Sequence, residues 1–278
     1  MSSSGRAMLT LRRKEPSSIP VEADSICPDR VVGLSRREVA ALPAFFGRRQ
    51  VTLGDLFDIE GNGGADIVVA GDLRAVKKIG YGMSMGRITV AGEVGPHLGA
   101  YMSGGEIVAE AGAGAWVGAH MKGGRIVVAG DAGHFVGGAY FGEPSGMRGG
   151  LIVIRGNAGR EVGARMRRGL IIVLGDTGEF TGASMVAGSV FVGGRPGDRC
   201  GAGMKRGSIV AFGDAPKLLP TFRRACRYRP VFLQYYLSWL REPLLTDAWA
   251  RTAGVFTRHI GDMNSGGRGE IIISDQSE

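Results

Sequence analysis

The sequence predicts an all-β fold, a parallel β-helix built from coils of 19 residues, and three observations lead to it. Glycine supplies 49 of the 278 residues without a Gly-X-Y period, which excludes collagen and indicates a chain dense in turns. Methionine, glycine and isoleucine or valine recur in fixed columns along the middle of the chain. Each repeat is too short to hold a strand and a crossover helix. Successive short strands are therefore expected to stack as coils.

Seven methionines mark the repeat. Each is followed three residues later by glycine and five residues later by isoleucine or valine. The intervals between them are 19 residues, except for one of 26, and the column consists of Met83, Met102, Met121, Met147, Met166, Met185 and Met204. We expect the Met and Ile/Val columns to form ladders in the core, and the glycine columns to lie at corners that need positive φ or at crowded interior positions.

Residues 112–118, with the sequence GAGAWVG, look like a nucleotide-binding loop. Their glycines, however, belong to columns that recur in every repeat. A dinucleotide loop also needs a strand, a loop and a helix within about 30 residues, and no helix fits between strands 19 residues apart. The repeat therefore excludes a dinucleotide site.

The chain is expected to divide into an N-terminal cap over residues 1–60, the repeat over residues 61–214, and a C-terminal helical extension with a final strand over residues 215–278. In the cap, residues 8–13 read as a strand, and residues 35–42 as a short helix with Ser35 as N-cap and Pro43 as its stop. Residues 221–243 are rich in aromatic residues and read as helix-like, with Pro230 near the start and Pro243 beyond the end. Residues 269–274 read as one more strand.

An insertion of seven residues, 140–146, lengthens one coil. Insertions in repeat proteins form loops on one face, which is often an interaction face. A neutral surface loop explains the insertion equally well.

The net charge of +8 indicates an acidic partner, which could be a nucleic acid, an anionic surface or a polyanionic cofactor. Cys27, Cys200 and Cys226 stand at unrelated spacings and form neither a disulfide framework nor a metal motif. The N-terminal residues lack the apolar segment of an export signal. We therefore expect a soluble cytoplasmic protein.

No catalytic or metal-binding arrangement is visible in the sequence. His97, His120 and His134 fall in three different columns, so neighbouring coils are not expected to bring them together as metal ligands. Asp131 and Asp176 share a column with other polar residues, which favours corner capping over catalysis. We expect no catalytic residues and no metal. The preferred interpretation is therefore a non-catalytic scaffold. The alternative is a solenoid that binds nucleic acid or another polyanion, although aromatic residues for base stacking are nearly absent from the coils.

The glycine repeat of residues 61–214 resembles the GXGXG domain shared by the large subunit of glutamate synthase and by the C subunit of formylmethanofuran dehydrogenases. The flanking LGDLFDIEG at residues 53–61 and the pattern ending in GRGEI at residues 267–271 resemble the C subunit over nearly the whole chain. The resemblance implies a right-handed β-helix that acts as a structural subunit, without catalytic residues of its own. It also implies a complex that handles a formyl group on a methanofuran-type cofactor. The other subunits of that complex would be an amidohydrolase-like metal-dependent subunit, a formyltransferase and a molybdopterin-type subunit.

Two kinds of complex are compatible with this resemblance. The formyltransferase/hydrolase complex of one-carbon metabolism transfers the formyl group and hydrolyses it to formate during formaldehyde oxidation, whereas the tungsten or molybdenum formylmethanofuran dehydrogenase reduces CO2. The chain has 6 lysines against 28 arginines, a bias typical of GC-rich bacterial genes. This bias favours the formyltransferase/hydrolase complex.

Two surfaces are predicted from the columns. The position six residues after each methionine should point outward, yet it is apolar, so we expect the C-terminal helix or a partner subunit to cover it. The column consists of Thr89, Val108, Val127, Val153, Ile172, Phe191 and Val210. Basic residues one, two or four positions after the methionines should align into a ladder on one side. They are Lys122, Arg125, Arg148, Arg167, Arg168, Lys205 and Arg206.

The resemblance gives this ladder a candidate ligand, because the methanofuran-type cofactor carries a polyglutamyl tail. Guanidinium groups bind carboxylates in a bidentate way, so the ladder is expected to bind that tail or an acidic partner. Arg223, Arg224 and Arg227 could extend it. A solvated basic face without a ligand is the alternative interpretation.

Overall fold

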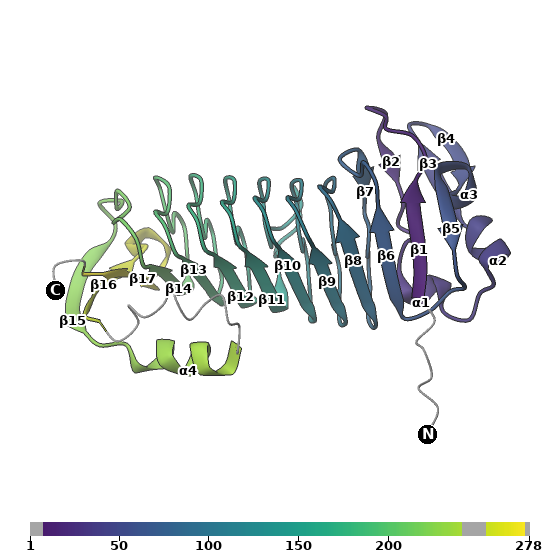
Figure 1. Ribbon diagram of the computed structural model, residues 1–278. Coiled ribbons are helices and arrows are strands. Elements are labelled where there is room, and N and C mark those ends of the chain that lie inside the picture. The colour runs from purple at the N-terminus through teal and green to yellow at the C-terminus, as the bar shows by residue number, and fades with distance from the viewer. Residues whose placement is uncertain (1–7, 241–253, 276–278) are drawn as a thin grey trace, which may run out of the picture.

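The computed structural model describes residues 8–240 and 254–275, and its fold is mostly β, with one long sheet running through the molecule (Figure 1). Thirteen strands form this sheet. Its central part follows the order of the chain, each strand being parallel to the one before. These strands are β6 (Asp66–Ala70), β8 (Arg87–Ala91), β9 (Glu106–Ala109), β10 (Arg125–Val128), β11 (Arg148–Ile154), β12 (Arg168–Val173), β13 (Ser189–Val192) and β14 (Arg206–Ala211).

The sequence repeat sets the register in which neighbouring strands pair. Ile107 pairs with Ile88 on one side and Ile126 on the other, and Ile126 pairs with Ile152 across the coil that holds the insertion. A second line of parallel bridges runs along another side of the stack, joining Leu73, Val94, Ala113, Ala132, Ala158, Thr177 and Pro196 in turn. Each coil therefore binds the next along two lines, as the 19-residue period predicts.

The predicted core ladders are present. All seven methionines of the column are buried with no exposed surface, and so are the isoleucines and valines five positions after them. One glycine column is needed for two reasons, which Gly99 illustrates. Its φ is +62°, and a Cβ at that position would lie 2.5 Å from the Cδ1 atom of Ile126. Glycine is thus required both by the turn and by the packing of the neighbouring coil.

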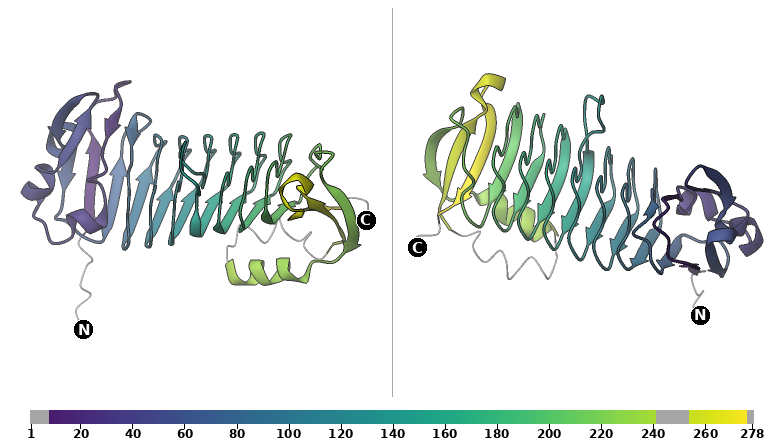
Figure 2. Two further views of the ribbon diagram at one scale, coloured as in Figure 1. Left: turned by 180° about the vertical axis from the view of Figure 1, so that it is seen from behind. Right: turned by 90° about the horizontal axis from the view of Figure 1, so that it is seen from above.

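At the N-terminal end, β1 (Met8–Arg13) pairs in parallel with β6 and antiparallel with β5 (Phe57–Glu60), so the stack ends in an antiparallel pair. A separate four-stranded sheet lies beside it (Figures 1 and 2). Its strands, in spatial order, are β4 (Arg49–Thr52), β3 (Pro43–Phe46), β2 (Val21–Glu22) and β7 (Val76–Lys77).

Three short helices complete this end: α1 (Pro28–Val31), α2 (Arg36–Ala40) and α3 (Leu53–Leu56). The predicted N-cap of α2 is confirmed, because the Ser35 side chain accepts from the backbone N–H of Glu38 while the Glu38 carboxylate accepts from the N–H of Ser35. Such a capping box satisfies two helix-terminal donors at once. Pro43 does not end the helix directly but opens β3 three residues later.

The C-terminal end corrects one prediction. Residues 221–243 were expected to be helix-like throughout, but β15 (Arg223–Tyr228) is a strand that pairs antiparallel with β16 (Phe256–Gly261). Only α4 (Val231–Leu240) is helical, beginning after Pro230 as expected, while Pro243 lies outside the described residues. The prediction of a helix was wrong for residues 223–228. The edge of the sheet offers their backbone the hydrogen-bond partners that a helix would otherwise supply.

The final strand is confirmed. After a short 3-10 turn, η2 (Met263–Ser265), β17 (Arg268–Ser274) pairs in parallel with β14 and antiparallel with β16. It continues the stack as one more rung, with Ile271 in register with Ile209.

Candidate functional site

The corner between each buried methionine and the following long strand carries a line of exposed cations. From Met102 onward, the residue after each methionine of the column donates its backbone N–H to the methionine carbonyl of the coil before. This bond is 2.7 Å from Lys122 to Met102, and 2.8 Å from Arg167 to Met147. The predicted alignment of basic residues is therefore present on consecutive coils. We call Lys122, Arg148, Arg167, Arg168, Lys205, Arg206 and Arg268 the basic row.

Arg268 was missed by the sequence interpretation. Its Cα lies in register with that of Arg206, although the two residues are far apart in the chain. A signal was available, because residues 206–209 read RGSI and residues 268–271 read RGEI. On the coil of β13 the row is interrupted by Val186, whose N–H makes the same bond, to Met166, at 2.8 Å.

The charges of the basic row are largely unbalanced by this chain. All its members are exposed, and within the described residues none of them forms an ion pair. With partners in the described part of the chain, only Arg148 forms a side-chain hydrogen bond, 3.1 Å from its Nε to Ser145 Oγ. Like charges about 4–5 Å apart repel by roughly 1 kcal/mol per pair even at the dielectric constant of water. A bound polyanion would remove that cost.

Arg125 differs from the rest of the predicted ladder. Its guanidinium pairs with the carboxylate of Glu106, which also lies 3.5 Å from Arg87. Arg227 is similarly engaged, 2.7 Å from Asp275. Arg223 and Arg224 are exposed on β15 at the end of the sheet. The structure thus places Arg125 and Arg227 in ion pairs of this chain, so their charges are already balanced.

The outward apolar column lies under the C-terminal elements. Val127, Val153, Ile172, Phe191 and Val210 are all at most 2% exposed, and they form one cluster with Leu233 of α4 and Phe256 of β16. Figure 1 shows α4 lying along the stack beside these strands. Thr89 and Val108, at the other end of the column, are only partly buried. The chain's own helix covers the column here, and a partner interface at this surface stays a prediction.

Another corner of the coils gathers aromatic rings, which corrects the expectation that they are nearly absent from the coils. We call this cluster the aromatic corner; it consists of Tyr81, His97, Tyr101, Trp116, His120, Phe135, Tyr140 and Phe141. Trp116 stacks on Phe135 with 4.2 Å between ring centroids, and Tyr101 stacks on His120 at 4.8 Å. The members of each stacked pair are 19 residues apart. That interval was the signal in the sequence that could have found them.

The column that contains Asp131 and Asp176 caps backbone N–H groups from one coil to the next, as expected, and we call it the capping ladder. Asp131 Oδ1 accepts from the N–H of Asn157 at 2.6 Å, Asn157 Oδ1 accepts from Asp176 at 2.9 Å, and Asp176 Oδ1 accepts from Arg195 at 2.7 Å. Each side chain therefore satisfies a backbone donor of the next coil.

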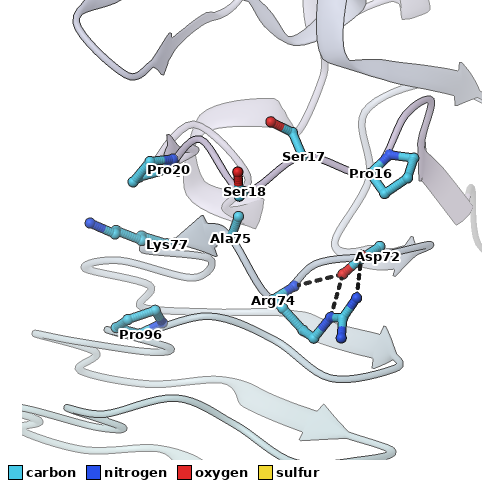
Figure 3. A pocket seen from close by; sticks show the side chains of 9 residues that line it. All are labelled: Pro16, Ser17, Ser18, Pro20, Asp72, Arg74, Ala75, Lys77 and Pro96. Carbon is cyan, nitrogen blue, oxygen red and sulfur yellow. Dashed lines mark hydrogen bonds and ion pairs between the residues drawn. The ribbon is translucent and has the colours of Figure 1, made fainter.

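A cleft of about 640 Å³ lies between residues 16–20 and the first coils (Figure 3). Two cations line it, Lys77 and Arg74, but Nε and Nη2 of Arg74 bind the carboxylate of Asp72 at 3.0 and 2.8 Å. Those hydrogen bonds lower the pKa of Asp72 to about 2. Arg74 is thus held by its own chain, so the cleft offers a ligand less charge than the basic row does.

Among residues 8–240 and 254–275, no three His, Cys, Asp or Glu side chains are grouped so as to hold a metal ion. Over the same residues, none of the helices has the length and apolar character needed to cross a bilayer.

Comparisons with known proteins found no matching family model. The chain is 38% identical over 97 residues to the C subunit of the molybdenum-containing formylmethanofuran dehydrogenase 1 of Methanosarcina barkeri, a match covering 33% of this chain and 32% of that protein. It is 36% identical over 91 residues to the C subunit of the formyltransferase/hydrolase complex Fhc of Methylorubrum extorquens, covering 33% and 34%. The matched part spans about a third of the length of these curated relatives.

A solved structure is similar over a much larger part. It is a chain of the crystal structure of the formyltransferase/hydrolase complex (FhcABCD) from Methylorubrum extorquens in complex with methylofuran. The TM-score is 0.88 and the identity 34%, and the alignment covers 96% of this chain and 100% of that chain.

Proposed function

Because the chain belongs to the family formed by the C subunit of formylmethanofuran dehydrogenases and of formyltransferase/hydrolase complexes, we propose that it is a non-catalytic structural subunit of a formyltransferase/hydrolase complex. Such a complex would transfer a formyl group to or from a methanofuran-type cofactor and hydrolyse it to formate in one-carbon metabolism. The observation that carries the proposal is the likeness to a chain of that complex over 96% of this sequence.

We infer that the stack is a right-handed parallel β-helix over residues 61–214, with residues 1–60 as an N-terminal cap and residues 215–278 as a C-terminal extension. The parallel register of β6 to β14 and the second line of bridges support the β-helix. The antiparallel pairs β1–β5 and β15–β16 support the two end regions, since open sheet ends invite unwanted pairing.

The partners proposed for this chain, assembled in the cytoplasm, are an amidohydrolase-like metal-dependent subunit, a formyltransferase subunit and a molybdopterin-type subunit that has lost its cofactor. The chemistry would lie on those partners. In this chain, the basic row is the proposed binding surface for the polyglutamyl tail of the cofactor or for an acidic partner. Its exposed and unpaired cations support that role, because carboxylates would offset their mutual repulsion.

The second candidate function is that of the C subunit in a CO2-reducing tungsten or molybdenum formylmethanofuran dehydrogenase. The 38% identity to the Methanosarcina barkeri protein favours it over part of the chain. The two functions differ in the partners: a dehydrogenase needs a subunit that holds a metal-pterin cofactor, and a hydrolase does not.

Purification of the tagged full chain from its native cell tests the proposal. We expect mass spectrometry to identify a formyltransferase subunit and an amidohydrolase-like subunit, and the purified complex to release formate from a formylated furan-amine cofactor. Formate release should not require molybdenum or tungsten. Recovery of the chain with a redox-active metal-pterin subunit and a ferredoxin-type partner would support the dehydrogenase instead, and recovery of nucleic acid would contradict both.

A further inference from the structure

The insertion of residues 140–146 folds back onto the aromatic corner instead of extending freely from the stack. Its first residue, Tyr140, packs against the rings of Trp116 and His120, both with 4.9 Å between ring centroids. Phe141 is 84% exposed. The view from above in Figure 2 shows the loop as a projection from an otherwise regular row of coils. The ring of Phe141 nevertheless meets that of Trp116 edge to face, with 5.6 Å between the centroids, so both rings of the insertion contact the aromatic corner.

His120 holds the first residue of the insertion. Its Nε2 accepts a hydrogen bond of 2.9 Å from the backbone N–H of Tyr140. His120 is only 5% exposed, and one face of its ring stacks on Tyr101, whose ring is parallel to it within 5°. One buried imidazole therefore fixes the start of the loop.

The hydrogen bond from Tyr140 requires that the His120 imidazole be neutral. Nε2 can accept the Tyr140 N–H only through its lone pair, so the proton of the neutral imidazole must sit on Nδ1. A second proton would place an N–H against an N–H inside a buried site. Such a contact loses a hydrogen bond and sets a buried positive charge against a backbone donor.

Burial favours the neutral state of the imidazole, because it lowers the pKa of His120. Among the groups that face the ring, the carboxylate of Glu143 and the backbone of Ser145 raise this pKa, and the guanidinium of Arg148 lowers it. Tyr101 and Tyr140 face the ring as uncharged phenols, because burial raises the pKa of each.

A second histidine contacts the loop from the coil before. Nδ1 of His97 lies 2.8 Å from the hydroxyl of Tyr140. Burial lowers the pKa of His97, as do Lys77 and Lys78, while Glu22 acts in the opposite direction. A neutral His97 can accept from the tyrosine hydroxyl, but a protonated one must give up that bond or reverse it.

We propose that residues 140–146 form a latch that neutral His120 holds closed over the aromatic corner and that protonation of His120 opens. Opening would uncover the rings of Tyr101 and Trp116. It would also break the bond between Ser145 and Arg148, which returns one more free guanidinium to the basic row. The latch is a property of this chain alone and stands whether or not the proposed function holds.

Hydrogen exchange of the full chain, measured by mass spectrometry between about pH 7.5 and pH 5 and corrected for the intrinsic rate, tests the latch. Peptides that contain residues 140–146 should exchange faster as the pH falls. The opening equilibrium should change by up to about tenfold per pH unit between the pKa of the released histidine, about 6.5, and the lower pKa of the latched one, as expected for one linked proton. Peptides from β11 and β12, in the core of the stack, should keep their protection.

Three variants separate the latch from general acid sensitivity. His120→Gln replaces Nε2 with an amide oxygen that accepts without titrating, so the loop should stay protected at every pH. His120→Ala removes the acceptor and should leave the loop open even at pH 7.5. The control is His134→Gln, which alters an exposed histidine that also accepts a backbone N–H, from Arg160 at 3.0 Å, but away from the loop. It should open with acid as the wild type does.

Two results would overturn the proposal. One is equal acid opening of residues 140–146 in the wild type and in His120→Gln. The other needs no variant that must fold: NMR titration of the wild type in which His120 becomes protonated while the exchange of the loop does not change.

Discussion

The ring of Tyr236 in α4 meets the ring of Phe191 in β13 edge to face, with 5.4 Å between the centroids and 84° between the planes. Phe191 is fully buried, although it points to the outer side of the long sheet. The contact shows that α4 is part of the fold of the stack. The sheet has apolar residues on both sides here because both sides are covered.

Ile172→Asp should strongly destabilise the protein. Ile172 is fully buried in the cluster beneath α4, and an aspartate there would be a buried charge without a partner. We expect a loss of at least about 3 kcal/mol in the free energy of unfolding, measured by urea denaturation of the full chain. Addition of Val153→Asp should abolish soluble expression.

The matched control for this prediction is Val108→Asp. Val108 belongs to the same column but is only partly buried, so its replacement should cost far less. Equal losses for the two single variants would show that the cover by α4 and β16 does not determine the cost.

Reversing three charges of the basic row should weaken polyanion binding. In the variant Arg148→Glu, Arg167→Glu, Arg168→Glu, the affinity for a labelled poly-γ-glutamate should fall at least tenfold at low salt. For the wild type, binding should weaken as salt rises, because the Debye length shrinks from about 30 Å at 0.01 M to about 3 Å at 1 M. Fluorescence anisotropy measures both effects.

A control variant of equal charge is available for the basic row. Arg48, Arg155 and Arg160 are exposed and lie elsewhere on the surface, so Arg48→Glu, Arg155→Glu, Arg160→Glu changes the net charge by the same amount. It should keep most of the affinity. If both triple variants lose the same amount of affinity, the net charge of the protein accounts for polyanion binding. The basic row is then an ordinary solvated face.

The free energy of unfolding should decrease in mild acid. Burial lowers the pKa of His97 and of His120 in the folded state, whereas in the unfolded chain each titrates near 6.5. Between the two pKa values the unfolded chain binds more protons, so their contribution is fully present above about pH 7 and is lost as the pH falls below 6.5. Urea denaturation across about pH 5 to 7.5 measures this slope.

The variant His97→Asn, His120→Gln should reduce the slope in that range. His259 is a third histidine whose pKa is lowered by partial burial, so part of the slope should remain. An unchanged slope in the double variant would mean that other groups carry the whole acid effect.

Asn157→Ala should remove one rung of the capping ladder. The Asn157 side chain accepts from the N–H of Asp176, while its own N–H is capped by Asp131 and would stay capped. Loss of the side-chain acceptor should cost about 1 kcal/mol of unfolding free energy, while Asn157→Asp keeps an acceptor oxygen and should cost less. Thermal denaturation of both variants checks the order, and an equal cost would rule out a capping role.

Glycine should have opposite effects at two left-handed positions. Glu161 has φ of +61°, where a side chain is strained, so Glu161→Gly should stabilise the protein by up to about 1 kcal/mol. Gly182 has φ of +69°, and a Cβ there would lie 2.5 Å from Ile209 Cδ1, so Gly182→Ala should destabilise it. If both changes shifted the melting temperature in the same direction, backbone strain would not distinguish the two columns.

The repeat could be predicted from the sequence because a stack brings residues one period apart into contact. The pairing of Ile107 with Ile126 therefore appears in the sequence as an interval of 19 residues, and so does the contact of Asn157 with Asp176. The contact of Asp131 with Asn157 appears as the longer interval of 26 residues, which includes the insertion. The strand at residues 223–228 could not be predicted in this way. It pairs with β16, which lies outside the repeat, so no regular interval in the sequence predicts this pairing.

The same reasoning explains the candidate site. The alignment of Lys122, Arg148 and Arg167 follows from the period, but the ion pair between Arg125 and Glu106 depends on how two side chains cross between coils. The contribution of Tyr140 and Phe141 to the aromatic corner depends on the path of the insertion. The sequence shows where residues 140–146 interrupt the period, but not that Tyr140 folds back onto His97, 43 residues earlier.

The stacking of the coils also sets a length. Thirteen strands spaced about 4.8 Å apart place the two outermost strands, β5 and β15, roughly 58 Å from each other. Because a coil is joined chiefly to the coils before and after it, one added or deleted repeat would change this span by about 4.8 Å and leave the remaining contacts in place. The number of repeats therefore sets the separation between molecules bound at the two ends of the sheet. Gain or loss of repeats can change that separation only in steps of one coil.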